Sequence, residues 1–99
     1  MVSWSQRARA DLKALHDHIA KESPQNAKTV AREILRRADA IEATPFVGRK
    51  VSELDDDSVR EIPAYSWRII YQVRDGTIFI VTLIHKRRHV EPEQVTPQP

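Results

Sequence analysis

The stretch at residues 67–85, WRIIYQVRDGTIFIVTLIH, decides how this chain folds. Two runs rich in β-branched and aromatic residues flank the dipeptide Asp75-Gly76, and such a composition favours strands. Both central residues of a tight type I′ turn need positive φ, which aspartate tolerates and glycine adopts readily. The sequence therefore predicts a β-hairpin with strands at residues 67–73 and 77–85.

The two-residue turn also fixes the register of the hairpin, and the register decides which side chains share a face. Counting outward from the turn, Arg68 is predicted to face Leu83. Arg68 and His85 then become diagonal neighbours among exposed aliphatic side chains, within reach of one phosphate, and Arg87 joins them if the strand continues. The other face is almost wholly apolar and is expected to pack against helices. This apolar face consists of Trp67, Ile69, Tyr71, Val73, Ile78, Ile80, Thr82 and Ile84.

A third strand is predicted at residues 59–62, where the alternation of polar and apolar residues is irregular. Arg60 and Glu61 cannot both face water if Val59 and Ile62 are both buried. A β-bulge or an edge position would resolve the conflict. One of the two charged residues is then expected to point at the basic face, and a purely structural role for the pair is the alternative.

Two helices are predicted before the strands. Ser5 suits an N-cap, and apolar residues spaced three and four apart follow it to about Lys21. Ser23 and Pro24 begin a second helix that extends to about residue 43. The short connection predicts an antiparallel helical hairpin, and residues 2–4 before the first helix suit an edge strand. The basic ridge of Lys28, Arg32 and Arg36 on the second helix is interpreted as a solvated face.

The length and composition restrict the class of protein. With 99 residues, 11.4 kDa and 40% hydrophobic residues, the chain suits one domain, predicted at residues 1–90. The polar, proline-containing residues 91–99 are predicted to be a disordered tail. The absence of cysteine excludes disulfides, thiolate metal sites and cysteine nucleophiles, and two glycines are too few for a glycine-rich phosphate loop. No cofactor or metal site is predicted.

Neither a membrane span nor a signal peptide is predicted, because no apolar run is long enough and the first residues lack an apolar stretch. A cytoplasmic location is therefore expected. The net charge is only +2, but acidic residues gather at residues 53–57 and basic ones at residues 85–89. Such separated poles favour a charged partner, with a solvated charge run as the alternative.

Several segments, in this order, resemble the ParE/RelE superfamily of type II toxin–antitoxin toxins, also called plasmid-stabilisation proteins. The resemblance covers about residues 3–88, and it implies an α+β fold of order β-α-α-β-β-β. In that fold an antiparallel helical hairpin packs on one face of a twisted, mainly antiparallel sheet. The segments are Trp4-Ser5 with Ala8 and Asp11-Leu12, Pro24 with Ala27, Pro45-Phe46-Val47-Gly48-Arg49, Val59-Arg60-Glu61-Ile62, Tyr65-Ser66-Trp67-Arg68-Ile69-Ile70-Tyr71, and His85-Lys86-Arg87-Arg88.

The superfamily holds two activities. ParE-like members act on DNA gyrase, whereas RelE-like members cleave messenger RNA in the ribosome. Under the RelE-like alternative, Arg60 and Arg68 would hold the phosphate, His85 would be the acid and Glu53 the base. These four residues are the catalytic candidates of that alternative only.

The ParE-like activity is favoured for this chain. The C-terminal tyrosine that many RelE-like nucleases carry is missing, because no tyrosine follows Tyr71. The lysine-rich segment typical of RelE is reduced to Lys50, and the ending at residues 85–88 is more similar to the His-x-Arg-Arg ending of ParE-like chains.

The resemblance further implies an acidic cognate antitoxin, ParD-like or RelB-like, in a heteromeric complex with the toxin. A degenerate toxin that only binds its antitoxin is a third hypothesis. Arg68→Ala and Arg87→Ala are expected to lower toxicity without unfolding the protein. The functional surface predicted from the sequence consists of Arg60, Arg68, His85, Arg87 and Arg88.

Overall fold

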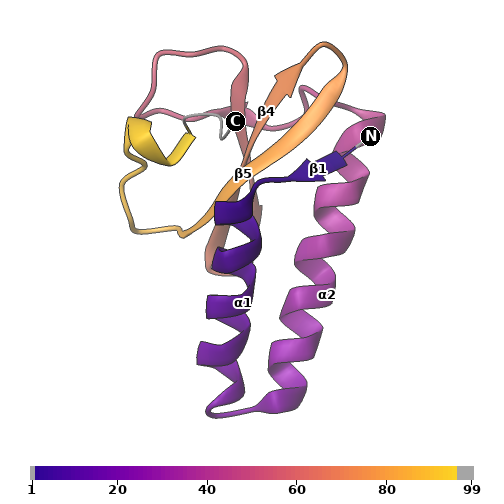
Figure 1. The fold of residues 1–99 in the computed structure, drawn as a ribbon, viewed down its shortest axis with the longest axis vertical. Coiled ribbons are helices and arrows are strands. Elements are labelled where there is room, and N and C mark those ends of the chain that lie inside the picture. The colour runs from indigo at the N-terminus through magenta and orange to yellow at the C-terminus, as the bar shows by residue number, and fades with distance from the viewer. Residues whose placement is uncertain (1, 96–99) are drawn as a thin grey trace.

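The computed structural model describes residues 2–95, which form one sheet and two long helices (Figure 1). The sheet has the order β1-β5-β4-β3-β2. β1 pairs with β5 in parallel, and the other neighbours are antiparallel. The elements are β1 (Val2–Trp4), α1 (Gln6–Ala20), α2 (Pro24–Ala40), the 3-10 helix η1 (Ile41–Ala43), β2 (Arg49–Lys50), β3 (Val59–Ala64), β4 (Trp67–Arg74), β5 (Thr77–His85) and the 3-10 helix η2 (Pro92–Val95).

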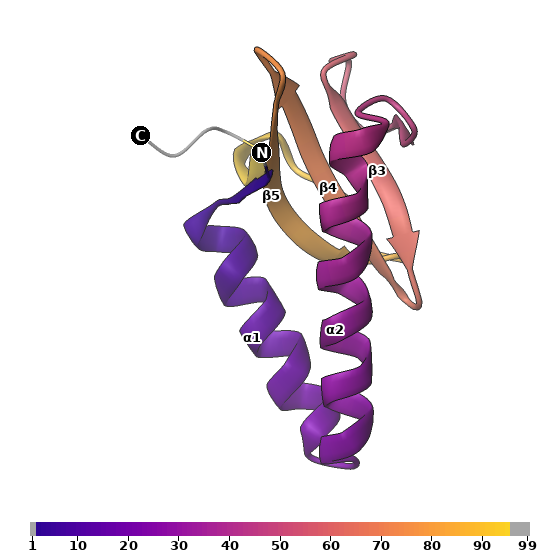
Figure 2. The same ribbon diagram turned by 90° about the vertical axis from the view of Figure 1, so that its right-hand side faces the viewer.

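The predicted α+β fold is confirmed, with the helical hairpin on one face of a mainly antiparallel sheet. Figure 2 shows α1 and α2 side by side on the same side of the strands. Both helices begin at the predicted caps. The Ser5 hydroxyl accepts a hydrogen bond from the Ala8 N–H at 3.0 Å, and the Ser23 hydroxyl accepts one from the Asn26 N–H at 3.1 Å. These bonds satisfy amides that lack a partner in the first turn.

The hairpin of β4 and β5 has the predicted turn but not the predicted register throughout. Asp75 and Gly76 both have positive φ, and the register holds as far as the pair Tyr71 and Ile80. Beyond this pair Ile70 is opposite Thr82, so Val81 is an extra residue on β5 and forms a β-bulge.

Helix α1 holds this bulge in place. The Ser5 hydroxyl donates a hydrogen bond to the Val81 carbonyl at 2.9 Å. The Asp11 carboxylate accepts hydrogen bonds from the Thr82 hydroxyl at 2.5 Å and from the Leu83 N–H at 3.1 Å. The helix and its N-cap thus supply partners to polar groups of the extra residue and of the two residues that follow it, which otherwise would be left without them.

The bulge overturns the predicted grouping of side chains. Arg68 is opposite Ile84, not Leu83, and Leu83 packs on the helix side while Ile84 packs on the opposite side. His85 is opposite Trp67, and the two rings make an edge-on contact with centroids 5.4 Å apart. The prediction that Arg68 and His85 share a face is therefore wrong, because one inserted residue reverses every side chain beyond it.

The sheet consequently separates two groups of buried apolar side chains. The first, the helix-side core, consists of Ala8, Leu15, Ile34, Ala38, Ile41, Ala64, Ile69, Tyr71, Ile78, Ile80 and Leu83. The second, called here the second core, consists of Val51, Val59, Ile70, Val81, Ile84 and Val90.

The face opposite the helices is not the exposed aliphatic surface that the sequence predicts. Ile70, Val81 and Ile84 are buried there, since residues 51–58 and 86–95 lie over this face. These segments contribute Val51 and Val90 to the second core, and their Leu54 and Val95 pack against it. The C-terminal residues also differ from the predicted disordered tail, because residues 92–95 form η2. The rest of that predicted tail, residues 96–99, lies outside the described residues.

Tyr71 fixes the loop that follows the helices. Its hydroxyl accepts a hydrogen bond from the Gly48 N–H and donates one to the Pro45 carbonyl, both at 2.9 Å. A Cβ at Gly48 would lie 2.6 Å from the tyrosine oxygen, so only glycine fits there. Tyr71 is therefore a core residue, and its burial raises the pKa of the phenol.

Candidate functional site

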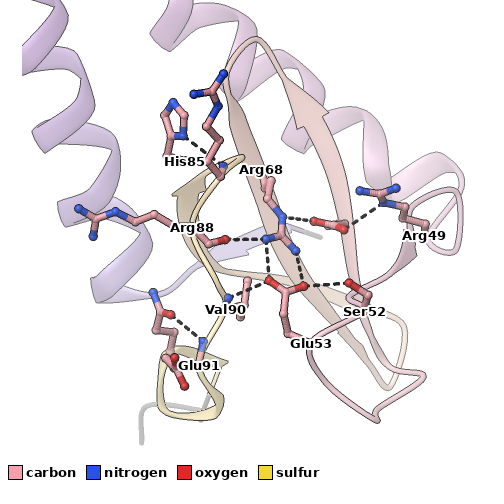
Figure 3. A network of polar contacts seen from close by, with 11 residues as sticks. Arg49, Ser52, Glu53, Arg68, His85, Arg88, Val90 and Glu91 are labelled. Atoms are coloured by element: carbon pink, nitrogen blue, oxygen red, sulfur yellow. Dashed lines mark hydrogen bonds and ion pairs between the residues drawn. The ribbon is translucent and has the colours of Figure 1, made fainter.

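The candidate site is centred on Arg68, which lies between two carboxylates on the face opposite the helices (Figure 3). Nη1 of Arg68 donates to Oε2 of Glu53 at 2.7 Å, and Nη2 donates to Oε1 at 2.9 Å. Nε of Arg68 donates to Glu61. The side chains of Arg68 and Glu53 are each 11% exposed and that of Glu61 is 4% exposed. The guanidinium is thus enclosed by its own partners.

Arg49 completes the charge balance of this network. Its Nε donates to Oε1 of Glu61 at 3.0 Å. Two arginines therefore meet two glutamates, so the network of Arg49, Glu61, Arg68 and Glu53 has no net charge. Buried charges are tolerated when they are paired and hydrogen-bonded in this way.

The network leaves Glu53 unsuited to act as a general base. Hydrogen bonds from Arg68 lower the pKa of Glu53 to about 2, although partial burial of the carboxyl opposes them. The same pairing raises the pKa of Arg68 further above its ordinary value. A base works best when its pKa lies near the working pH, so a carboxylate held this firmly is a weak proton acceptor.

The network also fixes the backbone that follows β5. Nη1 of Arg68 donates to the Arg88 carbonyl at 3.0 Å, and the Val90 N–H donates to Oε2 of Glu53 at 2.8 Å. Figure 3 shows the Arg88 carbonyl facing Arg68 while the Arg88 side chain points away from the network. Residues 86–95, called the C-terminal strap below, are therefore attached to the sheet by polar contacts with Arg68 and Glu53.

Two of the predicted site residues lie apart from Arg68. His85 is on the helix side of β5, and its Nδ1 accepts a hydrogen bond from the Arg87 N–H at 3.2 Å. Arg60 donates to the backbone carbonyls of Asp57 and Gly48, and its guanidinium carbon lies 5.1 Å from the centroid of the Phe46 ring.

The structure thus joins only part of the predicted set. Glu53 meets Arg68, and Arg87 and Arg88 belong to the adjacent turn, whereas Arg60 and His85 are elsewhere. The pairing of Glu61 with Arg68 and Arg49 is not predicted from the sequence. The irregular pattern at Arg60-Glu61 was the available signal, because it required one charged residue to point inward.

A second feature lies along the helices. A cavity of about 740 Å³ is lined by β1 and by both helices. Leu12 and Leu35 contribute apolar surface to its lining, and Leu35 is 42% exposed. Basic residues occur along the same lining, namely Arg9, Lys13 and His16.

Residues 2–95 contain no group of three histidine or acidic side chains placed to hold a metal ion. In the same described part of the chain, no helix has the length and apolar character needed to cross a bilayer.

Comparison with known families gives a match over nearly the whole chain. The family model described as the ParE toxin of the type II toxin–antitoxin system parDE matches residues 2–90. A curated protein of Caulobacter vibrioides named toxin RelE2 is 37% identical over 90 residues, which cover 88% of this chain and 96% of that protein.

Solved structures share the fold. The chromosomal ParDE toxin–antitoxin system of P. aeruginosa includes a chain with a TM-score of 0.71 and 20% identity, over 85% of this chain and 92% of that one. The YoeB-YefM toxin–antitoxin complex of Staphylococcus aureus includes one with a TM-score of 0.58 and 18% identity, over 86% and 94% of the two chains.

Proposed function

Because this chain belongs to the ParE toxin family of type II toxin–antitoxin systems, we propose that it stops bacterial growth by inhibiting DNA gyrase. It acts in the cytoplasm, without a cofactor, and a cognate antitoxin neutralises it. The state of Arg68 is the observation that carries the choice of gyrase over messenger RNA. Its guanidinium is hydrogen-bonded to Glu53 and Glu61, and the side chain is almost completely shielded from solvent.

Ribonucleolytic cleavage would need three groups around one phosphate. A base must take the proton of the 2′-hydroxyl, a cation must stabilise the phosphate, and an acid must protonate the leaving oxygen. Here the candidate base and cation, Glu53 and Arg68, neutralise each other, and the candidate acid His85 lies on the other side of the strand. This arrangement favours a toxin that works by binding.

Cleavage of messenger RNA in the ribosome is the second candidate. The relative named toxin RelE2 favours it, because RelE-like members of the superfamily have that activity. A ribosomal contact that broke the pair between Glu53 and Arg68 would be required to expose the guanidinium.

Purified protein separates the candidates. We expect inhibition of gyrase supercoiling with accumulation of cleaved DNA, and no message cleavage in a translating extract. Toxin mixed beforehand with its antitoxin is the matched control and should restore supercoiling. Message cleavage without any effect on gyrase would contradict the proposal, and activity in neither assay, with normal growth after induction, would leave only antitoxin binding.

The antitoxin is proposed to bind the cavity between β1, α1 and α2. The apolar surface and basic lining of this cavity suit an acidic amphipathic segment that folds as it binds. Leu35→Glu should weaken antitoxin binding at least tenfold while toxicity persists, since Leu35 lies outside both buried clusters. Val47→Glu, at an exposed position that does not line this cavity, serves as the control for an added charge. Unchanged affinity of the Leu35 variant in calorimetric titration would remove this cavity from consideration.

A further inference from the structure

The turn after β5 carries four consecutive basic residues, and all four are exposed. The turn is defined by Lys86, Arg87, Arg88 and His89 and is called the basic turn below. Within residues 2–95, no carboxylate forms an ion pair with the side chains of Lys86, Arg87 or Arg88. These cations are therefore available to a partner.

Positive charge is concentrated at this corner of the molecule. The basic turn borders an open basin of about 530 Å³. Arg49 and Arg68 are balanced there by Glu53 and Glu61. Lys86, Arg87 and Arg88 therefore give this corner a net charge of +3, compared with a net charge of +2 for the whole chain. The remainder of the protein is thus slightly negative, and the electrostatic potential favours the approach of an anion to this corner.

The backbone under these cations is held rigidly. The Lys86 N–H donates to the Ser66 carbonyl at 2.8 Å, and the Arg88 N–H donates to the His85 carbonyl at 2.9 Å. Arg68 and Glu53 hold the next two attachment points, the Arg88 carbonyl and the Val90 N–H. A fixed backbone lowers the ordering cost when a ligand binds.

We propose that the basic turn binds the phosphodiester backbone of duplex DNA. This inference rests on the proposed action on gyrase and adds to it that the toxin contacts DNA as well as the enzyme. Unpaired lysine and arginine side chains on one turn are the usual electrostatic footprint of a phosphate contact. Contacts of this kind position a protein on DNA without reading its sequence.

A duplex suits the basin better than a single strand. Non-specific binding of single strands relies on aromatic side chains on which bases stack. Among the described residues that line this basin there is no phenylalanine, tyrosine or tryptophan. The basin therefore offers mainly charge to a backbone, with His89 as the one ring among its described lining residues.

The test measures binding of the purified protein to a short labelled duplex DNA by fluorescence anisotropy over a series of salt concentrations. The logarithm of the association constant should fall against the logarithm of the salt concentration with a slope of roughly −3 for three phosphate contacts. The double variant R87Q/R88Q should bind at least tenfold more weakly at low salt, with a slope about two units shallower.

The matched control is K28Q/R32Q, which removes two exposed charges from the basic ridge on α2. This control should bind as the unchanged protein does. Equal weakening in both double variants would overturn the proposal, because only the total charge would then matter. Thermal unfolding should be the same in all three proteins, since the substituted side chains are exposed.

Further probes distinguish the alternatives. Single-stranded RNA should bind more weakly than duplex DNA, and tighter binding of the RNA would overturn the assignment to a duplex. Tighter binding of poly-glutamate than of DNA would instead indicate an acidic protein partner and also overturn it. DNA binding without inhibition of gyrase would support this site while contradicting the proposed function. Gyrase inhibition that survives in R87Q/R88Q without DNA binding would support the proposed function and contradict a role for this site in it.

Discussion

The two faces of the sheet are stabilised in different ways. On the helix side, α1 and α2 cover eleven buried apolar residues within residues 2–95. On the other side, two irregular segments cover six, and a network of four charged side chains joins those segments to β3 and β4. Apolar burial and hydrogen bonds from Ser5 and Asp11 organise the first face, whereas the smaller second face also depends on paired charges.

Arg68 is therefore better described as a structural residue that holds the C-terminal strap than as a free phosphate ligand. Residues 86–91 of the C-terminal strap lie outside regular secondary structure, so their backbone groups need other partners. Arg68 and Glu53 supply partners to the Arg88 carbonyl and the Val90 N–H. The same contacts fix the basic turn, so the proposed DNA contact depends on the pairing of Arg68 with Glu53.

The largest effect is expected on the helix side. Ile69→Asp places a charge without a partner at a fully buried position of the helix-side core, and it should abolish folding because an isolated buried charge is very costly. Circular dichroism should show an unfolded chain, whereas Ile69→Val should lose only about 1 kcal/mol. A folded Ile69→Asp protein would contradict the assignment of this face as the main core.

Arg68→Ala probes the adjacent residue, which points to the other face. The sequence predicts that this variant stays folded, but the structure predicts a loss of about 3–5 kcal/mol, because Glu53 would lose its cation and Glu61 would keep only the exposed Arg49. Urea unfolding at neutral pH measures the loss. In the double variant of Arg68→Ala and Glu53→Gln, the losses of unfolding free energy should not add, since one buried carboxylate is then neutral. Simple additivity would contradict the structural role of the pair.

The second face should also respond to acid. The pKa of Glu53 is about 2 in the folded protein, below the ordinary value of 4.5, so its stabilisation is complete above that ordinary value and is lost as the pH falls through the folded pKa. The loss is at most about 3 kcal/mol. The pKa of Glu33 on α2 is also lowered to about 2, so the acid response of the unchanged protein contains contributions from both glutamates. The measurement is therefore the difference between the unchanged protein and Glu53→Gln, which should shrink between pH 5 and pH 2.

The smallest effect is expected at the bulge. Asp11→Ala removes the acceptor of the Thr82 hydroxyl and the Leu83 N–H and should cost about 2 kcal/mol in thermal unfolding. Asp17→Ala, farther along the same helix, breaks only exposed contacts with Lys13 and His16 and should change stability by less than about 0.5 kcal/mol. Equal losses in the two variants would show that Asp11 does not support the bulge.

Local signals made most of the fold predictable from the sequence. The caps at Ser5 and Ser23 and the Asp75-Gly76 turn act over a few residues, and each is present in the structure. The bulge at Val81 was not predictable, because residues 78–84 are uniformly suited to a strand and its support comes from α1, some 70 residues away.

The candidate site was predictable only in part for the same reason. Arg68 and Glu53 were named as candidates, but their mutual pairing depends on where the loop of residues 51–58 lies. The grouping of Arg68 with His85 failed through the bulge alone, since one inserted residue separates them.

Hydrogen exchange at the Val90 amide tests most directly whether the Glu53–Arg68 pair holds the C-terminal strap. In the unchanged protein this amide donates to Glu53 and should exchange slowly. In Glu53→Ala we predict that Val90 and the basic turn lose protection while the amides of α1 keep theirs. Unchanged protection at Val90 in this variant would contradict the account, because the strap would then be held by apolar contacts alone.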